Sequence, residues 1–97
     1  MAEVVTMVSG MIEPGRVDEV LEAYRDALRD GPPPDIAETF LLQEDGHRLS
    51  VLSVWHRRAG LEAMLASGEE PFARRLIRGA GGTPEVRILE ILHHAGG

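Results

Sequence analysis

Hydrophobic and polar residues follow strand-like and helix-like spacings in successive segments of the chain. Val4–Ile12 is rich in β-branched residues and apolar on both alternating faces, which predicts a strand in the interior of a sheet. After the turn signal Glu13-Pro14-Gly15, apolar side chains recur every three or four residues from Val17 to Leu28, which predicts a helix. Gly31 and the prolines that follow it end this helix, because proline cannot continue the helical hydrogen bonds.

The middle of the chain predicts a β-hairpin and then an interrupted helix. Ile36–Gln43 and Leu49–His56 have the composition of strands, and the Asp45-Gly46 pair between them favours a tight turn, so the two strands should pair antiparallel. Helical spacing returns from Arg57 to Arg78. It is broken before Pro71, a residue well suited to begin a new first turn.

A last strand, Val86–Leu92, follows a glycine-rich connection and completes the order strand, helix, strand, strand, helix, strand. This order predicts a ferredoxin-like α+β fold (βαββαβ), in which a four-stranded antiparallel sheet carries both helices on one face. We expect one domain over residues 1–97, because a chain of this length cannot form a second core.

The predicted strands are apolar on both faces, so the sheet needs cover on both. In the first strand, for example, Val5 and Met7 lie on the opposite face from Val8. Two helices can cover one face only, and a large apolar surface rarely stays in water. We therefore expect the other face to meet a second copy of the chain in a closed two-fold homodimer.

Composition excludes several kinds of partner. The formal net charge is −6, from 16 acidic and 10 basic residues, and a negative surface repels nucleic acid and anionic lipid. No apolar run approaches the roughly 20 residues that cross a bilayer, and the N-terminus lacks the features of a signal peptide. We expect a cytoplasmic protein with neither a nucleic-acid nor a membrane partner. The chain has no Cys, which excludes disulfides, a thiol nucleophile and thiolate metal sites.

Two stretches of the chain resemble the antibiotic biosynthesis monooxygenase (ABM) family. One is Ile12–Val20 (IEPGRVDEV), which enters the first predicted helix, and the other is Leu52–Leu65 (LSVWHRRAGLEAML), where a strand ends at Trp55 and leads into the second helix. The resemblance extends over almost the whole chain and implies a dimeric ferredoxin-like α+β barrel. It leaves the chemistry open, because the family includes quinone-forming oxygenases without a cofactor, haem-degrading oxygenases and members with no known reaction.

The chain also differs from the family at informative places. Haem-degrading members carry an Asn on the first strand and a Trp and a His on the second helix, and matching the helix entries puts Val8, Met64 and Arg74 there. The missing His leaves no obvious axial ligand for haem iron, so haem degradation does not carry over. Quinone-forming members use Asn, Trp, Tyr and Arg around the pocket. This chain offers Trp55, Tyr24 and an Arg-Arg pair, but has no Asn.

The hairpin suggests where a site would lie. With a two-residue turn at Asp45-Gly46, Glu38 faces Ser53 and lies diagonal to Trp55, which gives a polar pair on an otherwise apolar face. A bulge in the turn would instead place Glu38 opposite Leu52. The structural alternatives are a solvated carboxylate on an edge strand for Glu38 and a core ring for Trp55.

The predicted activity is monooxygenation of a small electron-rich aromatic molecule, such as a phenol or hydroquinone, with no metal or other cofactor. The deprotonated substrate supplies the electron to O₂, and the protein supplies a dry pocket, a base and an anion-stabilising donor. In this hypothesis Glu38 is the base, Trp55 the aromatic platform and Arg74 the donor. Of Arg74 and Arg75 only one can face inward, since adjacent helix positions differ by about 100°, and a solvated pair is the alternative.

Further residues are predicted to bind the substrate, namely Tyr24, Phe40, Ser53, Met64 and Phe72. The competing hypothesis, from a different class of function, is a small-molecule-binding or structural dimer of the same fold that catalyses no reaction.

Overall fold

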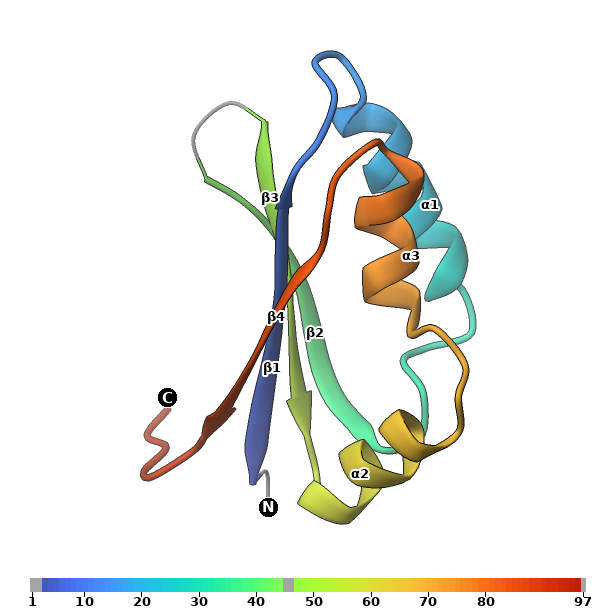
Figure 1. Ribbon diagram of the computed structural model, residues 1–97. Helices are drawn as coiled ribbons and strands as arrows, with labels where there is room; N and C mark the ends of the chain where they lie inside the picture. Colours follow the sequence, from blue (N-terminus) through green and yellow to red (C-terminus); the bar gives the residue numbers. More distant parts are fainter. Residues whose placement is uncertain (1–2, 45–46, 97) are drawn as a thin grey trace.

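A single sheet with helices on one face forms the computed structural model, which describes residues 3–44 and 47–96 (Figure 1). In the described part of the chain, four antiparallel strands lie in the order β2-β3-β1-β4, namely β1 (Val4–Met11), β2 (Ile36–Gln43), β3 (Arg48–Trp55) and β4 (Glu85–Glu90). The helices over its inner face are α1 (Val17–Ala27), α2 (Arg58–Ala66) and α3 (Phe72–Gly79). The predicted ferredoxin-like fold is thus confirmed. As predicted, Pro71 caps a new helix after the break.

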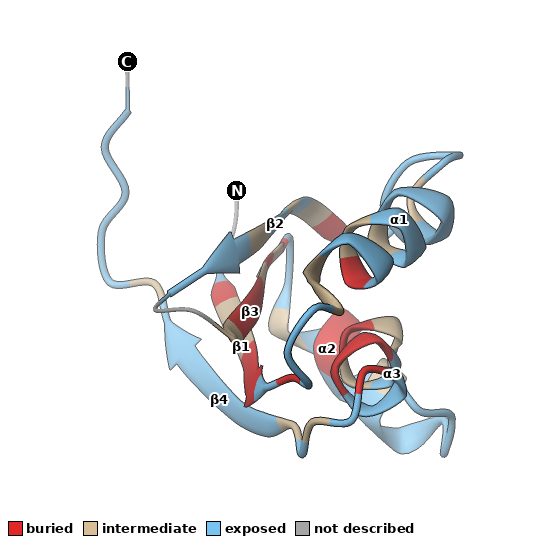
Figure 2. Cartoon of the chain, turned by 90° about the horizontal axis from the view of Figure 1, so that it is seen from above, coloured by how far each residue is buried: buried red, intermediate tan, exposed pale blue. Residues whose placement is uncertain are grey.

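Buried side chains of the inner sheet face pack against the helices. Figure 2 shows the buried residues of the sheet and helices in red. One cluster joins β1 and β3 to α1 and α3, and includes Val8, Val51, Val20 and Ile77. The second cluster joins the other end of the sheet to α2; it comprises Val4, Ile36, Trp55 and Leu61. Among the described residues, no helix is long and apolar enough to cross a membrane.

Arg16 ties the start of α1 to the end of α3. Its guanidinium donates to both carboxylate oxygens of Glu19, at 2.9 and 2.6 Å, and to Glu13 at 2.9 Å. It also donates to the carbonyl oxygen of Gly79 at 2.8 Å. The hydrogen bonds from Arg16 lower the pKa of Glu19.

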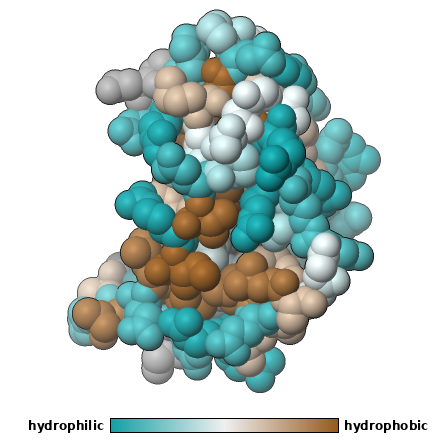
Figure 3. Space-filling model, viewed as in Figure 1, coloured by the Kyte–Doolittle hydropathy of each residue, from teal (hydrophilic) through white to brown (hydrophobic). Residues whose placement is uncertain are grey.

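The outer sheet face has no cover within one subunit. Phe40 and Leu89 remain 42% and 45% exposed on it, and Met11 is 55% exposed. β4 is exposed along its whole length, on both faces. Figure 3 shows hydrophobic side chains gathered over β4 and toward α2. The folded sheet therefore carries apolar side chains on both faces, as predicted from the strands.

The pairing of β2 with β3 differs from the predicted register. Glu44 donates its backbone N–H to the carbonyl of Arg48 at 2.9 Å, so three residues separate the paired positions instead of two. The turn residues themselves, Asp45 and Gly46, lie outside the described residues. A shift of one residue turns every β2 side chain to the opposite face of the sheet.

This shift overturns the expected neighbours of Glu38. It lies opposite Val54, so the expectation that it faces Ser53 is wrong, and so is the alternative that it faces Leu52. Thr39 takes the place opposite Ser53. Ile36 nevertheless lies opposite Trp55, where a two-residue turn would also place it, because an irregularity between Ile36 and Glu38 absorbs the extra residue.

Gly10 lets α3 approach β1 closely, and this contact gives a test of the packing. A Cβ at Gly10 would lie 2.5 Å from Cγ2 of the fully buried Ile77 and 3.0 Å from the carbonyl oxygen of Thr83. We expect Gly10→Ala to lower the free energy of unfolding by about 1–3 kcal/mol, because this core has no room for a methyl group. Urea unfolding measures the change.

Gly79→Ala is the matched control for that substitution. No atom lies within 4 Å of a Cβ placed at Gly79, the last residue of α3. Alanine also favours helix over glycine, so this variant should be as stable as the parent or more stable by up to about 1 kcal/mol. Equal stability of the Gly10 and Gly79 variants would contradict the close approach of α3 to β1.

Candidate functional site

A cavity of about 420 Å³ lies between the inner sheet face and the α2–α3 segment. β1 and β3 provide its floor, α2 and α3 its walls, and β4 one side of its rim. Its lining is mostly apolar and includes Trp55, Met64 and Phe72. Leu65 and Ile88, which are exposed, lie at the rim. A mostly apolar hollow with a few polar groups is typical of a small-molecule site.

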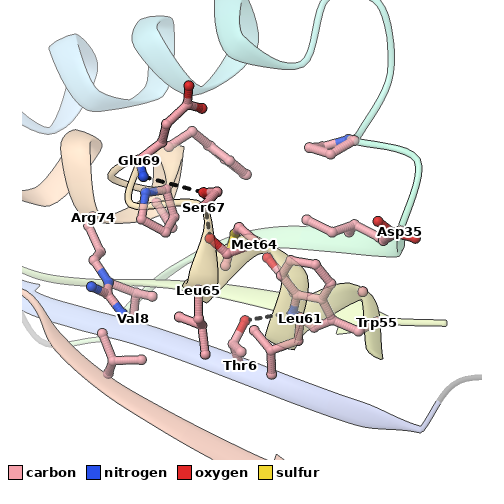
Figure 4. Close-up of a pocket in the computed structure, with 18 of the residues that line it drawn as sticks. Thr6, Val8, Asp35, Trp55, Leu61, Met64, Leu65, Ser67, Glu69 and Arg74 are labelled. Carbon is pink, nitrogen blue, oxygen red and sulfur yellow. Dashed lines mark hydrogen bonds between the residues drawn. The ribbon is translucent and has the colours of Figure 1, made fainter. Parts of the chain in front are cut away.

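Trp55 forms one end of the floor and is held by a hydrogen bond. It is the last residue of β3 and only 4% exposed. Its indole Nε1–H donates to Oγ1 of Thr6 at 3.0 Å, as drawn in Figure 4. Thr6 lies directly across from Ser53 in the β1–β3 pairing, so two buried hydroxyl groups sit side by side on the floor.

A chain of hydroxyl groups leads from the floor of the cavity to α1. The side-chain oxygens of Ser53 and Thr39 are 3.3 Å apart, and Tyr24 donates to Thr39 at 3.3 Å. The Tyr24 ring also packs against Phe72, with centroids 6.4 Å apart. Tyr24 is therefore in the layer behind the cavity wall.

Arg74 brings a positive charge to the apolar cavity. It is half-buried on α3, and Figure 4 shows its side chain extending toward Val8 on β1. No described residue forms an ion pair or hydrogen bond with its guanidinium, whereas Arg78 pairs with Glu70 at 3.2 Å. Arg75 also borders the cavity but is exposed. Arg74 is thus available to bind an anionic oxygen.

The structure brings together most of the residues predicted for the site. Of the eight, those that border this one cavity are Trp55, Arg74, Ser53, Met64 and Phe72. Glu38 and Phe40 are exposed on the outer face, since the register shift turns them away from Trp55. The alternative reading of Glu38 as a solvated carboxylate on an edge strand describes its position correctly.

Several cavity residues were missed in the sequence, among them Thr6 and Asp35. Thr6 interrupts the apolar inner face of β1 between Val4 and Val8, and a lone polar residue on such a face is the signal that could have pointed to it. Asp35 reaches the cavity from the segment before β2 (Figure 4). Its neighbour Gly60 in α2 has no room for a Cβ, which would lie 2.7 Å from the Asp35 side chain. Sequence spacing carries no signal for a contact of this kind.

Three residues stand where the haem-degrading proteins carry Asn, Trp and His, and all three reach the same cavity. Val8, Met64 and Arg74 all border it. They do not supply the His ligand of the haem-degrading proteins, because a guanidinium stays protonated and cannot act as a ligand, and no His is among the lining residues. Nor does the described part of the chain contain a group of three or more His, Cys, Asp or Glu residues arranged for a metal ion.

Solved structures with a similar fold include proteins of several functions. A protein of unknown function from Nitrosomonas europaea is 17% identical with a TM-score of 0.72, and the match covers 100% of this chain and 96% of that one. SnoaB, a cofactor-independent oxygenase from Streptomyces nogalater, is 15% identical with a TM-score of 0.68, over 95% of both chains. A heme-degrading protein from Mycobacterium tuberculosis is 19% identical with a TM-score of 0.61, over 100% of both chains.

Further similar structures bear the name antibiotic biosynthesis monooxygenase, one of them from Caulobacter crescentus with 15% identity, a TM-score of 0.64 and coverage of 95% of this chain and 92% of that one. Neither a family model nor a curated protein sequence matches the chain significantly. At these identities the likeness concerns the fold alone. The chain has the fold of the antibiotic biosynthesis monooxygenase proteins, as the resemblance in its sequence predicted.

Proposed function

We propose that the chain is a cofactor-independent monooxygenase for a small electron-rich aromatic molecule with an acidic hydroxyl group. The observation that carries this proposal is the Arg74 guanidinium, which has no partner among the described residues and borders an apolar cavity together with Trp55. A charge in such surroundings favours a ligand that brings the opposite charge. The flat indole of Trp55 suits an aromatic ring.

Arg74 supplies the step that starts the reaction. It stabilises the deprotonated substrate relative to the neutral one, and so lowers the pKa of the bound phenol. A phenol made acidic in this way loses its proton to water and needs no carboxylate base. Glu38, on the outer face, has no part in this version of the mechanism.

The oxidation then needs no reductant beyond the substrate. The phenolate gives one electron to O₂, and the two radicals combine in a C–O bond at a ring carbon. The peroxide takes up a proton. Its O–O bond breaks as the ring carbon loses its hydrogen as a proton, hydroxide leaves, and a carbonyl remains. One oxygen atom enters the product and the other leaves as water, so that 1-naphthol, for example, would give 1,4-naphthoquinone.

The competing function is a dimer that binds a small molecule without reaction. The absence of Asn from the chain favours it, because quinone-forming members of the ABM family use an Asn around the pocket. Such a binding protein would take the same ligand as the proposed enzyme but would not convert it.

We also propose that the protein is a homodimer joined through the outer sheet face. The exposed Phe40, Leu42 and Leu89 lie on this face. Beside them the described residues also bury a polar pair, Ser9 and Ser50, whose hydroxyl oxygens are 2.8 Å apart and satisfy each other. A second copy with the same surface would cover it by two-fold symmetry.

Binding of an anionic aromatic probe tests the role of Arg74. Trp55 is the only Trp, so its fluorescence quenching reports binding of 2-hydroxy-1,4-naphthoquinone, which is already oxidised and does not turn over. We expect Arg74→Gln to weaken binding about 10–100-fold, as for the loss of a charge-assisted hydrogen bond. Arg57→Gln removes the same charge from an exposed position outside the cavity lining and should change binding less than about twofold. Equal effects of the two variants would contradict the site.

Oxygen consumption separates the enzyme from the binding protein. With 1-naphthol or anthrone the enzyme should consume one O₂ per substrate, and ¹⁸O₂ should place one labelled atom in the product. Arg74→Gln and Trp55→Ala should abolish the uptake while circular dichroism shows that both remain folded. Binding of the probe without any uptake would favour the dimer that catalyses no reaction.

Light scattering at micromolar concentration tests the homodimer. We expect twice the mass of one chain, and Leu89→Glu should shift the protein toward single subunits, because it buries a charge in the interface. Ala59→Glu places the same charge on an exposed position of α2 and should leave the mass unchanged. Single subunits of the unaltered protein at this concentration would refute the dimer.

A further inference from the structure

Thr6 holds an unused hydrogen-bond donor at the floor of the cavity. A hydroxyl has one proton to donate and two lone pairs to accept, whereas the indole N–H of Trp can only donate. In the 3.0 Å bond between them Thr6 Oγ1 must therefore be the acceptor, and its own proton is left for another partner. No described residue accepts that proton.

The surroundings of Thr6 indicate that an acceptor for its hydroxyl proton would lie in the cavity. Thr6 is 7% exposed and points to the inner face, between Val4 and Val8 along β1 and beside Ile88 on β4. Those neighbours are apolar. Across the pairing with β3 lies Ser53, whose hydroxyl bonds to Thr39 and forms no hydrogen bond with Thr6.

We infer that Thr6 is a specificity-determining residue, which donates a hydrogen bond to a neutral carbonyl oxygen of the ligand, with Trp55 as the residue that positions it. This inference rests on the proposed function, in which Arg74 binds the acidic oxygen of the same ligand. The two groups reach the cavity from different elements, Thr6 from β1 and Arg74 from α3 (Figure 4). They select an aromatic molecule with both a carbonyl and an acidic hydroxyl group, as in hydroxyquinones and hydroxylated anthrones.

Trp55 gives the donor its direction. While the indole N–H occupies one lone pair of Thr6, the hydroxyl proton turns away from that bond. A ligand without a carbonyl would leave this buried donor without an acceptor, so the site favours a ligand that has one. Selectivity would thus come from a neutral hydroxyl and binding strength from Arg74.

Calorimetric titration with two probes tests the inference. One is 2-hydroxy-1,4-naphthoquinone, which has carbonyl groups, and the other is 2-naphthol, which has none. We expect Thr6→Val, which keeps the shape of the side chain, to weaken binding of the naphthoquinone about tenfold and of 2-naphthol by less than about twofold. Thr6→Ser keeps the hydroxyl and should retain the preference.

Trp55→Phe is the second variant, which tests the positioning and serves also if Thr6→Val fails to fold. It keeps an aromatic ring and removes the N–H, so the preference for the naphthoquinone should fall although Thr6 is unchanged. If Thr6 had a purely structural role, Thr6→Val would weaken the binding of both probes alike. That result, or unchanged binding of both probes, would overturn the inference. Arg74→Gln tests the proposed function separately, since it should weaken binding of the naphthoquinone whether or not Thr6 donates a hydrogen bond. If the parent protein binds neither probe, both proposals are wrong.

Discussion

The break between α2 and α3 is the constraint on which the site depends. α2 ends at Ala66, Gly68 follows with a φ of +80°, and Pro71 is the N-cap of α3. Gly favours this left-handed backbone and Pro cannot donate a helical hydrogen bond, so one continuous helix cannot form here. Two short helices cover the sheet less completely than one long helix, and the uncovered part of the inner face is the cavity floor. An unbroken helix over the same stretch would fill that space with side chains.

The same break determines where charge enters the cavity. α3 begins afresh at Phe72, so its first turn brings Phe72 and Arg74 to the wall while Leu76 and Ile77 pack into the core. The guanidinium at this position forms no ion pair with a described carboxylate, although Asp35, Glu69 and Glu70 also border the cavity. The apolar surroundings strengthen its attraction for an anion, because little water is present to screen it.

The cavity floor shows how a sheet can combine rigidity with polarity. Thr6 and Ser53 are neighbours in the central pair of strands, where backbone hydrogen bonds restrict both residues. The bond from Trp55 and the contact with Thr39 use acceptor or donor capacity that would otherwise be unpaired in an apolar layer. Polar groups held this firmly can orient a ligand with little loss of side-chain entropy.

The sequence alone determined the order of the elements, the two-sided apolar character of the strands and the break at Pro71, since these depend on local spacing and on backbone limits of single residues. It also indicated Trp55 and Arg74 for the cavity, because both follow from the face of one element. Only the tertiary structure decided the neighbours of Glu38. One additional residue in a hairpin loop reverses the faces of β2 from Glu38 onward, and nothing in the local composition of β2 records that choice. The bond from Trp55 to Thr6 joins residues 49 positions apart, so it too arises only when the strands pair.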